Sequence, residues 1–478
     1  MEFEDNSERE EENQDSCKPK RQKMMTPFQL EALGLEKACA LDACTSKSIT
    51  AISSAYTPME SSPTTAISDE TLAISCHDYS LPDKLWVEIM SRLPVKSLLR
   101  CKCVQRPWRR LINTLIHDQT FVTKHLNNYS TDRPSLYIMS YDVSRRARNS
   151  FVTMICNQND DDALLDTIIE DFDLSSFRQQ YHMSFPASHC NGIMCISVRQ
   201  QNVVLLCNPA LREFKFITGS CLGPWRINEQ TRMVGFGHDT VDDVYKVVRV
   251  ACKGALLLGA EIHTLGIDHH NSWRKLNTEE HFHVGYTPSL LYPEVQCKSF
   301  IYWLTYGCRN SNPVIISFDV HDEDFQTISL PTLDDNFSAT ETCSDVSYKL
   351  ALWNESVALF KFYVPRCRCG KRSTACFSPK PIEMWVLDES SKGPEKSYFW
   401  TKHLIIPPLD RCYRPQVFWT NDELILTSFS WSTDHTRKIS FASSYNLVTQ
   451  KVRRLRGIPE TLEGIGSFAY VQSLVSIT

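Results

Sequence analysis

Three cysteines close together are the residues best placed to bind a metal ion. Cys367, Cys369 and Cys376 fall within ten residues of one another, and thiolates at short spacing are preferred ligands of zinc. Structural zinc sites, however, usually take cysteine pairs separated by about two to four residues. The stretch around these three is also rich in arginine and lysine. We therefore predict a solvated basic loop there, and no metal site in the protein.

The sequence motifs of common catalytic and cofactor sites are missing. There is no phosphate-binding Gly-x4-Gly-Lys-Ser/Thr loop, no His-Glu-x-x-His zinc helix and no Gly-x-Ser-x-Gly nucleophile turn. Gly235 and Gly237 are too few for a dinucleotide fingerprint, and we expect a turn or bulge at this point. Five histidines between residues 263 and 283 fall on alternating strands and turns, and we expect them on the surface. The sequence predicts neither an active site nor a cofactor.

Composition points to a globular protein of several domains. The chain has 478 residues, of which 42% are hydrophobic and 22% charged, and this length favours two or three domains. The net charge of -5 argues against a protein that mainly coats nucleic acid. No apolar run approaches the roughly 18 residues that a membrane span needs. We expect no membrane segment and no nucleic-acid partner.

Residues 1–78 are expected to form a disordered extension. An acidic run and a basic run, Lys18 to Lys23, precede a stretch rich in Ser, Thr and Ala, which buries too little apolar surface to fold alone. The basic run resembles a nuclear import signal, but a solvated charge run is the favoured interpretation. The acidic N-terminus does not have the pattern of a secretory signal. The 19 cysteines are therefore expected to be reduced, in the cytoplasm, the nucleus or both.

Short amphipathic helices are predicted between residues 79 and 128. Ser80 to Asp83 has the form of a capping box, Pro94 ends the first helix, and a second follows from Val95. A third carries an apolar stripe from Trp108 to Ile116. Three helices of this length cannot enclose so many large apolar side chains, so part of the surface should contact a partner. Eight basic against two acidic residues between Ser80 and Ile112 predict an acidic partner.

Residues 131–478 show the alternation of short strands separated by turns. A loose repeat has a strand that ends at Asn or Asp, a polar turn, and a large apolar residue that opens the next strand. The Asn or Asp anchors are 60, 51, 69 and 58 residues apart, about the length of a four-stranded propeller blade with long loops. The anchor pairs are Asn208 and Phe214, Asp268 and Trp273, Asp319 and Phe325, Asp388 and Trp400, and Asn446 and Val452. The predicted fold is a small helical domain followed by an all-β, kelch-like propeller.

The helical segment resembles an F-box, and the remainder is similar to the F-box-associated domain of plants. The F-box likeness rests on Leu81-Pro82, Glu88-Ile89, Leu93-Pro-Val-Lys-Ser-Leu-Leu-Arg-Cys101, Val104, Trp108 and Leu111-Ile112. The likeness of the associated domain rests on Cys190-Asn-Gly-Ile-Met-Cys195, Leu206-Cys-Asn-Pro-Ala-Leu-Arg-Glu-Phe214, Gly235-Phe-Gly-His-Asp239, Ile316-Ser-Phe-Asp319 and Ile382-Glu-Met-Trp385. Within that family the sequence is most similar to the S-locus F-box proteins of self-incompatible plants. It departs from the pattern at Pro107 and by an insertion from Asn113 to Ile116.

The resemblance implies a substrate-recognition subunit of a Skp-cullin-F-box (SCF) ubiquitin ligase. The F-box would bind a Skp-type adaptor and, through it, cullin and RING subunits, while the C-terminal domain holds the protein to be ubiquitinated. Its substrate would be a pistil ribonuclease, and the chain itself would not be an enzyme. The implied adaptor-binding residues are Leu81, Pro82, Ile89, Leu93, Pro94, Leu98, Leu99, Val104 and Trp108.

Acidic residues recur in the predicted loops of the β domain and favour a basic substrate. The residues predicted to bind it are Asp242, Asp243, Asp322, Glu323 and Asp324. The same turns would also keep a large β domain soluble, and both interpretations stay open. Alternative functions are a DNA-binding helical module, a carbohydrate-binding propeller, and an F-box relative that binds its target without delivering it to a ligase.

Overall fold

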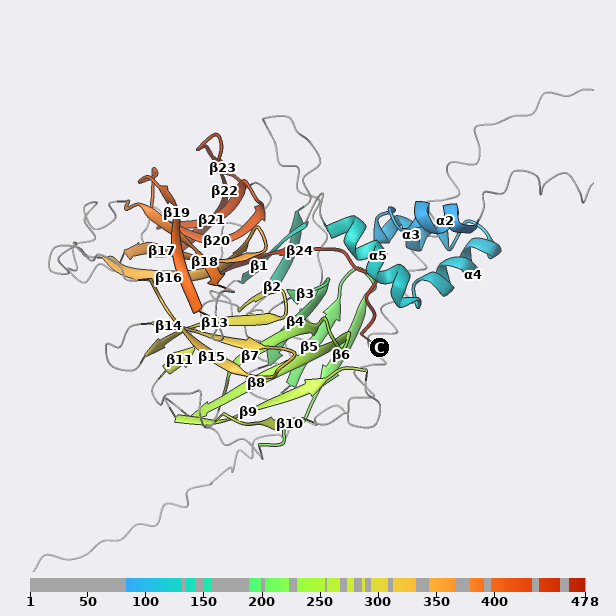
Figure 1. Ribbon diagram of the computed structural model, residues 1–478. Helices are drawn as coiled ribbons and strands as arrows, with labels where there is room; N and C mark the ends of the chain where they lie inside the picture. The colour runs from blue at the N-terminus through green and yellow to red at the C-terminus, as the bar shows by residue number, and fades with distance from the viewer. Residues whose placement is uncertain are drawn as a thin grey trace, which may run out of the picture. The chain divides into compact units, whose positions relative to one another are not determined.

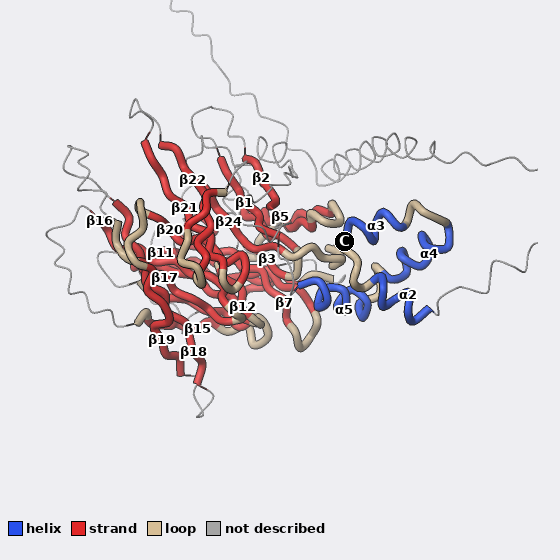
Figure 2. Tube along the Cα trace, turned by 90° about the horizontal axis from the view of Figure 1, so that it is seen from above, coloured by secondary structure: helices blue, strands red, loops and turns tan. Residues whose placement is uncertain are grey.

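The structure is a computed structural model. It describes residues 83–130, 135–141, 150–155, 189–198, 203–222, 230–253, 256–266, 273–278, 286–288, 294–307, 313–331, 344–365, 379–390, 397–431, 438–455 and 464–477. The predicted N-terminal extension and the three clustered cysteines lie outside these residues. Helices form one part of the described chain and strands the other (Figure 2).

The described residues of the helical domain form four helices, one more than the sequence predicted. They are α2 (Asp83–Met90), α3 (Val95–Cys101), α4 (Arg106–Leu115) and α5 (Gln119–Ser130). Asp118 caps α5, because its carboxylate accepts a hydrogen bond from the Thr120 amide at 2.9 Å. Pro107 lies in the first turn of α4, where its missing N–H has no helical partner to lose. The departure at Pro107 therefore leaves α4 intact.

All paired strands of the β domain are antiparallel, and they form six sheets among the described residues. The first three sheets comprise β1 (Ser135–Tyr141), β2 (Ser150–Ile155) and β24 (Gly464–Tyr470); β3 (His189–Cys190), β4 (Ile193–Val198), β5 (Val203–Asn208) and β6 (Glu213–Ile217); and β7 (Gln230–Asp239), β8 (Val244–Lys253), β9 (Leu256–Thr264) and β10 (Arg274–Leu276). The next two comprise β11 (Tyr286–Pro288), β12 (Val295–Cys297), β13 (Phe300–Gly307), β14 (Val314–Asp319) and β15 (Phe325–Ser329); and β16 (Ser344–Trp353), β17 (Ser356–Pro365), β18 (Ile382–Ser390) and β19 (Ser397–Ile406). The last comprises β20 (Tyr413–Thr420), β21 (Glu423–Trp431), β22 (Lys438–Asn446) and β23 (Val452–Arg454).

The order of the sheets is that of a propeller. Figure 1 shows β24 beside β1, so the last strand pairs with the first. Apolar clusters lie between sheets that follow each other in sequence, with one cluster shared by the β7–β10 and β11–β15 sheets and the next by the β11–β15 and β16–β19 sheets. In β14, Ile316 belongs to the first of these clusters and Ile315 to the second. Burial on both faces explains why such strands are continuous apolar runs.

The predicted repeat corresponds to the turn between the third and fourth strands of a sheet. Asn208 ends β5, Asp319 ends β14 and Asn446 ends β22, each with the large apolar partner at or next to the start of the following strand. The pair Asp388 and Trp400 does not fit, because both residues lie inside their strands and Asp388 pairs with Phe399. Asp268 lies outside the described residues. The side-chain oxygens of Asn208, Asp319 and Asn446 accept backbone amides two or three residues ahead, for example His321 N on Asp319 at 2.9 Å. These side-chain turns reverse the chain locally. The propeller prediction is confirmed.

Gly235 and Gly237 lie inside the regular strand β7, so the prediction of a turn or bulge there is wrong. The pairing of β7 with β8 is regular from Met233 to Asp239 and shifts earlier, between Thr231 and Met233. A Cβ atom on Gly235 would lie 2.4 Å from Cζ2 of Trp303. The glycine is needed because the neighbouring sheet packs directly against the backbone.

The surface position expected for His263 is also wrong. Its side chain is buried and its ring meets Trp273 edge to face at 5.5 Å. The guanidinium carbon of Arg249 lies 3.5 Å from the centroid of the Trp273 ring. Arg249 also forms an ion pair with the buried Glu261. His263 therefore lies in the core, on the ring of a tryptophan that also contacts a buried ion pair. The other four histidines lie outside the described residues.

Residues 471–477 form a tail that is hydrogen-bonded to the β3–β6 sheet. The Asn208 side chain donates through Nδ2 to the carbonyl oxygens of Ser473 at 3.1 Å and of Val475 at 2.7 Å. The Glu213 carboxylate accepts the Ile477 amide at 3.0 Å. The predicted anchor residue Asn208 therefore has two structural roles. It closes its own turn, and it binds the tail through its side-chain amide.

One apolar cluster joins the tail, the β3–β6 sheet and the helical domain. Its buried members include Leu98 and Ile112 from the helices, Ile193 and Leu206 from the sheet, and Leu474, Val475 and Ile477 from the tail. The sequence predicted that apolar surface of the helices would contact a partner. Part of that surface is instead covered by the same chain.

Candidate interaction surfaces

The helical domain exposes large apolar side chains to solvent. Leu85 and Ile89 lie one turn apart on α2, with 47% and 42% of their surface exposed, and Val104 follows α3 with 65% exposed. Exposed apolar groups gathered on so small a domain are typical of a contact surface. Beneath them the rings of Trp86 and Trp108 meet edge to face at 5.3 Å and hold α2 against α4.

The predicted adaptor-binding residues differ in exposure. Ile89, Pro94 and Val104 are exposed, Leu93, Leu99 and Trp108 are half-buried, and Leu98 is fully buried. Leu81 and Pro82 lie outside the described residues. The structure therefore gives Leu98 a core position, from which it supports the surface without being accessible to a partner.

The basic character of the helical domain is retained at its surface. Glu88 forms ion pairs with two of the cations, Arg92 at 2.7 Å and Lys124 at 2.5 Å. Hydrogen bonds from Lys124 and Arg92 lower the pKa of Glu88. The remaining exposed cations include Lys84, Arg100, Arg106, Arg109 and Arg110. Exposed apolar side chains and exposed cations on one small domain fit an acidic protein partner.

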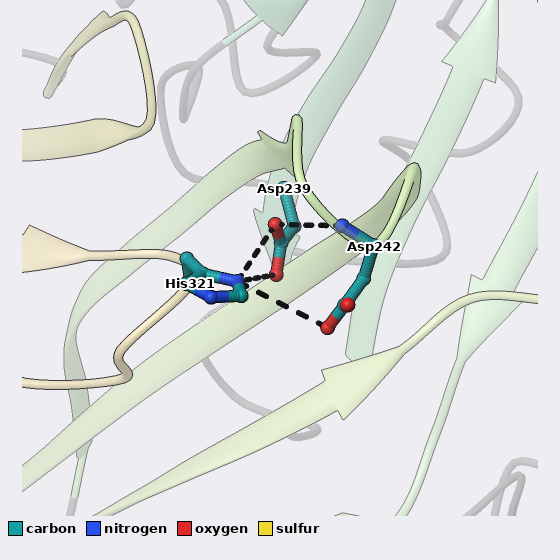
Figure 3. Close-up of side chains that lie close together, drawn as sticks. All are labelled: Asp239, Asp242 and His321. Atoms are coloured by element: carbon teal, nitrogen blue, oxygen red, sulfur yellow. Dashed lines mark hydrogen bonds and ion pairs between the residues drawn. The ribbon is translucent and has the colours of Figure 1, made fainter.

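The acidic residues predicted to bind substrate come together at two neighbouring turns. Asp242 and Asp243 lie in the β7–β8 turn, and Asp322, Glu323 and Asp324 lie in the β14–β15 turn. Figure 3 shows His321 of the second turn directed at Asp239 and Asp242 of the first. Its Nδ1 lies 3.2 Å from Asp239 and 4.0 Å from Asp242.

Asp239 is the buried centre of this cluster, although sequence reasoning did not select it. Its carboxylate accepts the Val241 and Asp242 amides at 3.0 and 3.2 Å and the Lys246 ammonium at 2.9 Å. Burial by itself would raise the pKa of Asp239, but the hydrogen bonds from Lys246 and the two amides outweigh it and keep the pKa below its ordinary value. Asp239 also raises the pKa of His321, which donates to it.

Asp239, Asp242 and His321 are chemically suited to hold a metal ion, since their ligand atoms all lie within 4.8 Å of one another. The Lys246 ammonium, however, already occupies the buried carboxylate and also donates to the Val320 carbonyl at 2.9 Å. A divalent cation would have to displace this lysine. The cluster is better described as a polar link between the β7–β10 and β11–β15 sheets.

Two of the predicted acidic residues are engaged within the chain. Asp243 accepts hydrogen bonds from His238 Nε2 at 2.9 Å and from Gln119 of α5 at 3.4 Å. Glu323 is mostly buried, pairs with Lys246 at 3.2 Å and contacts Arg274. The side chains of Asp242 and Asp243 are nevertheless 61% and 55% exposed, and Asp322 is exposed as well, so these three carry most of the acidic surface that a partner can reach. Sequence reasoning had no signal for the pairing of Glu323, because its cations Lys246 and Arg274 come from another sheet.

Family models match both parts of the chain. Residues 136–462 match the F-box associated beta propeller domain, and residues 79–120 match an F-box-like model. The chain belongs to the family of F-box proteins with an associated propeller. In the part of this F-box protein that the structure describes, every helix is too short or too polar to cross a lipid bilayer.

Relatives in Arabidopsis thaliana are distant in sequence. One F-box protein is 28% identical over 275 residues, which cover 54% of this chain and only 61% of the relative. A second F-box protein is 25% identical over 410 residues, covering 80% of this chain and 90% of the relative. An F-box/kelch-repeat protein is 26% identical over 365 residues, covering 75% and 87%.

Proposed function

We propose that this F-box protein is the substrate-recognition subunit of a Skp-cullin-F-box ubiquitin ligase. The observation that carries the proposal is the exposed apolar patch of Leu85 and Ile89 on α2, with Val104 exposed after α3, on a basic helical domain that is continuous with a propeller. The patch supplies an adaptor contact, and the propeller supplies a separate surface for the target. The protein then contributes proximity, because it raises the effective concentration of substrate lysines near a ubiquitin-conjugating enzyme.

Pull-down of a purified Skp-type adaptor by the full chain tests the adaptor contact. The double variant Leu85→Asp/Ile89→Asp places two charges in the patch and should abolish binding while leaving the melting curve of the propeller unchanged. The matched control is Val448→Asp, since Val448 is 74% exposed and lies on the β22–β23 turn. Adaptor binding by the folded double variant, at the level of the control, would show that α2 is not the contact.

The proposed substrate is a basic protein, with a secreted-type pistil ribonuclease as the class implied by the S-locus likeness. Asp242 and Asp322 are exposed on adjoining turns and would attract a cationic surface. Glu323 is a poor choice for mutation because it holds Lys246. We expect Asp242→Asn/Asp322→Asn to weaken binding to a panel of basic ribonucleases at low salt, with the exposed Asp422→Asn as control. Binding by no member of the panel would remove the substrate assignment and leave the adaptor assignment standing.

A further inference from the structure

Three arginines line the solvent-facing side of α4. Arg106, Arg109, Arg110 and Asn113 are all exposed, and their offsets of 0, 3, 4 and 7 place them on one stripe of a helix. The opposite side of α4 is apolar, with Ile112 fully buried, and packs into the cluster shared with the propeller. The helical register therefore directs the three arginine side chains outward together.

The positive charge of this arginine stripe is not compensated within the described part of the chain. Arg106, Arg109 and Arg110 form no ion pair with any residue that the structure describes, and Glu88 is engaged by two other cations. Burial, followed by repulsion from Arg109, lowers the pKa of Lys102. The first turn of α4 contains no acidic residue, although the positive end of the helix dipole favours one there. An acidic surface from outside would stabilise this charge.

A surface of the opposite charge lies on the acidic turns of the propeller. The side chains of Asp242 and Asp243 are 61% and 55% exposed, and Asp322 is exposed as well. Gln119, the first residue of α5, donates to Asp243 at 3.4 Å, so the acidic turns adjoin the helical domain. The helix α4 ends at Leu115, four residues before Gln119. The chain therefore carries a basic and an acidic surface on neighbouring parts of its structure.

These two surfaces do not neutralise each other within one chain. The acidic turns make their contacts elsewhere, since Asp243 accepts hydrogen bonds from His238 and Gln119 and Asp242 lies 4.0 Å from His321. Both surfaces thus stay exposed and available to a second molecule. A chain that presents both signs of charge is complementary to a second copy of itself, whereas an unrelated acidic protein would use only the arginine stripe.

We propose that two copies of this chain associate, with the arginine stripe of α4 in one copy facing the acidic turns of the other. The guanidinium groups bind the carboxylates of Asp242 and Asp322 through charge-assisted hydrogen bonds. Because the contact is polar and exposed, the association is weak, increases with protein concentration and decreases with salt.

The contact is separate from the exposed apolar patch of α2. Trp108 packs against Trp86 of α2 at 5.3 Å between ring centroids, and the arginine stripe lies on the other side of α4 from Trp108. Self-association of the purified chain therefore does not depend on the ligase assignment, and loss of adaptor binding would leave it unchanged.

Sedimentation velocity of the full chain in reducing buffer, over a series of protein and salt concentrations, tests the proposal. We expect a dimer population at low salt that disappears as salt rises. Arg106→Glu/Arg110→Glu should weaken self-association roughly tenfold or more, because attraction becomes repulsion. Asp242→Lys/Asp322→Lys should weaken it to a similar extent. An equimolar mixture of the two variants should associate again, because their reversed charges are complementary.

The matched control is Lys275→Glu/Lys451→Glu, which makes the same change in net charge. Both lysines are exposed and belong to neither surface, so this variant should associate as the parent does. Glutamate in the first turn of α4 is favoured by the helix dipole, so the arginine variant should keep the melting midpoint of the parent. If the midpoint falls, Arg106→Gln/Arg110→Gln repeats the test with neutral side chains.

Several outcomes would overturn the proposal. One is a parent protein that stays monomeric at low salt at the highest concentration reached. Another is a mixture of the two reversed variants that does not associate, and a third is an equal loss in the lysine control, which would show a diffuse charge effect. A monomeric parent that binds a ten-residue glutamate peptide, with affinity lost in the arginine variant, would assign the stripe to a different acidic protein.

Discussion

Replacement of Asn208 by alanine should loosen the tail and its turn together. Asn208 is fully buried and makes four hydrogen bonds. It donates to the carbonyl oxygens of Ser473 at 3.1 Å and Val475 at 2.7 Å, and its Oδ1 accepts the Ala210 and Leu211 amides at 2.9 and 3.3 Å. The alanine variant removes all four and leaves their backbone partners in a buried place.

The cost follows from those contacts. A hydrogen bond is worth about 0.5 to 1.5 kcal/mol net, and a buried group left without a partner costs about 1 to 3 kcal/mol. The two carbonyl groups that lose their donor belong to the buried residues Ser473 and Val475, whereas the turn amides belong to half-buried residues. We therefore expect Asn208→Ala to lower the free energy of unfolding by roughly 2 to 4 kcal/mol.

Urea unfolding with hydrogen exchange of residues 471–477 measures the effect. The matched control is Asn446→Ala, because Asn446 makes the same type of turn, accepting the Thr449 amide at 2.8 Å, without holding the tail. It should cost about 1 kcal/mol. Asn208→Asp keeps the turn acceptor, loses the donors, and should expose the tail to exchange. An Asn208→Ala protein within about 0.5 kcal/mol of the parent, or with an unchanged tail, would refute the reasoning.

Three other outcomes are expected. Gly235→Ala should destabilise the propeller by several kcal/mol, since a Cβ would lie 2.4 Å from the Trp303 ring, and a melting midpoint equal to that of the parent would contradict it. Lys349, which donates to Gln416 at 2.7 Å, has its pKa lowered by burial to about 7. Its proton therefore favours the unfolded state, so stability should rise as pH rises from 7 toward 10, and Lys349→Met should be more stable at pH 7 and lose this dependence. A chelator should leave the melting midpoint unchanged because Lys246 fills the Asp239 cluster, and stoichiometric metal whose removal lowers the midpoint would count against this.

Local sequence signals predicted the helices and the repeat because their causes are local. Pro94 both ends α2 and starts α3, and the Asn208, Asp319 and Asn446 side chains close their own turns within three residues. The continuation of the helical domain into α5 was missed, although Asp118 before Thr120 was a capping signal. Local signals of this kind do not depend on the rest of the fold.

The glycines of β7 and the ionic groups of the β7–β10 sheet needed the tertiary structure. Gly235 was predicted in a turn from its residue type, but its partner is Trp303 on another sheet. His263 was predicted at the surface, but Trp273 lies against it in the core. Neither neighbour is close in sequence, so no hydrophobic period or local motif predicts either contact.

By itself the sequence determined a small basic helical domain with excess apolar surface, followed by a repetitive antiparallel β domain, and the family to which both belong. Spacing and residue type act over a few positions, and they suffice for helix stripes and turns. Only the tertiary structure decided how the charges are divided. It paired Glu323 with Lys246, left Asp242 and Asp243 exposed, and placed Arg411 and Arg454 near one ring, that of Phe441. The physical reason is that a charge is compensated by whatever lies a few ångströms away, and in a propeller those neighbours come from strands far apart in the chain.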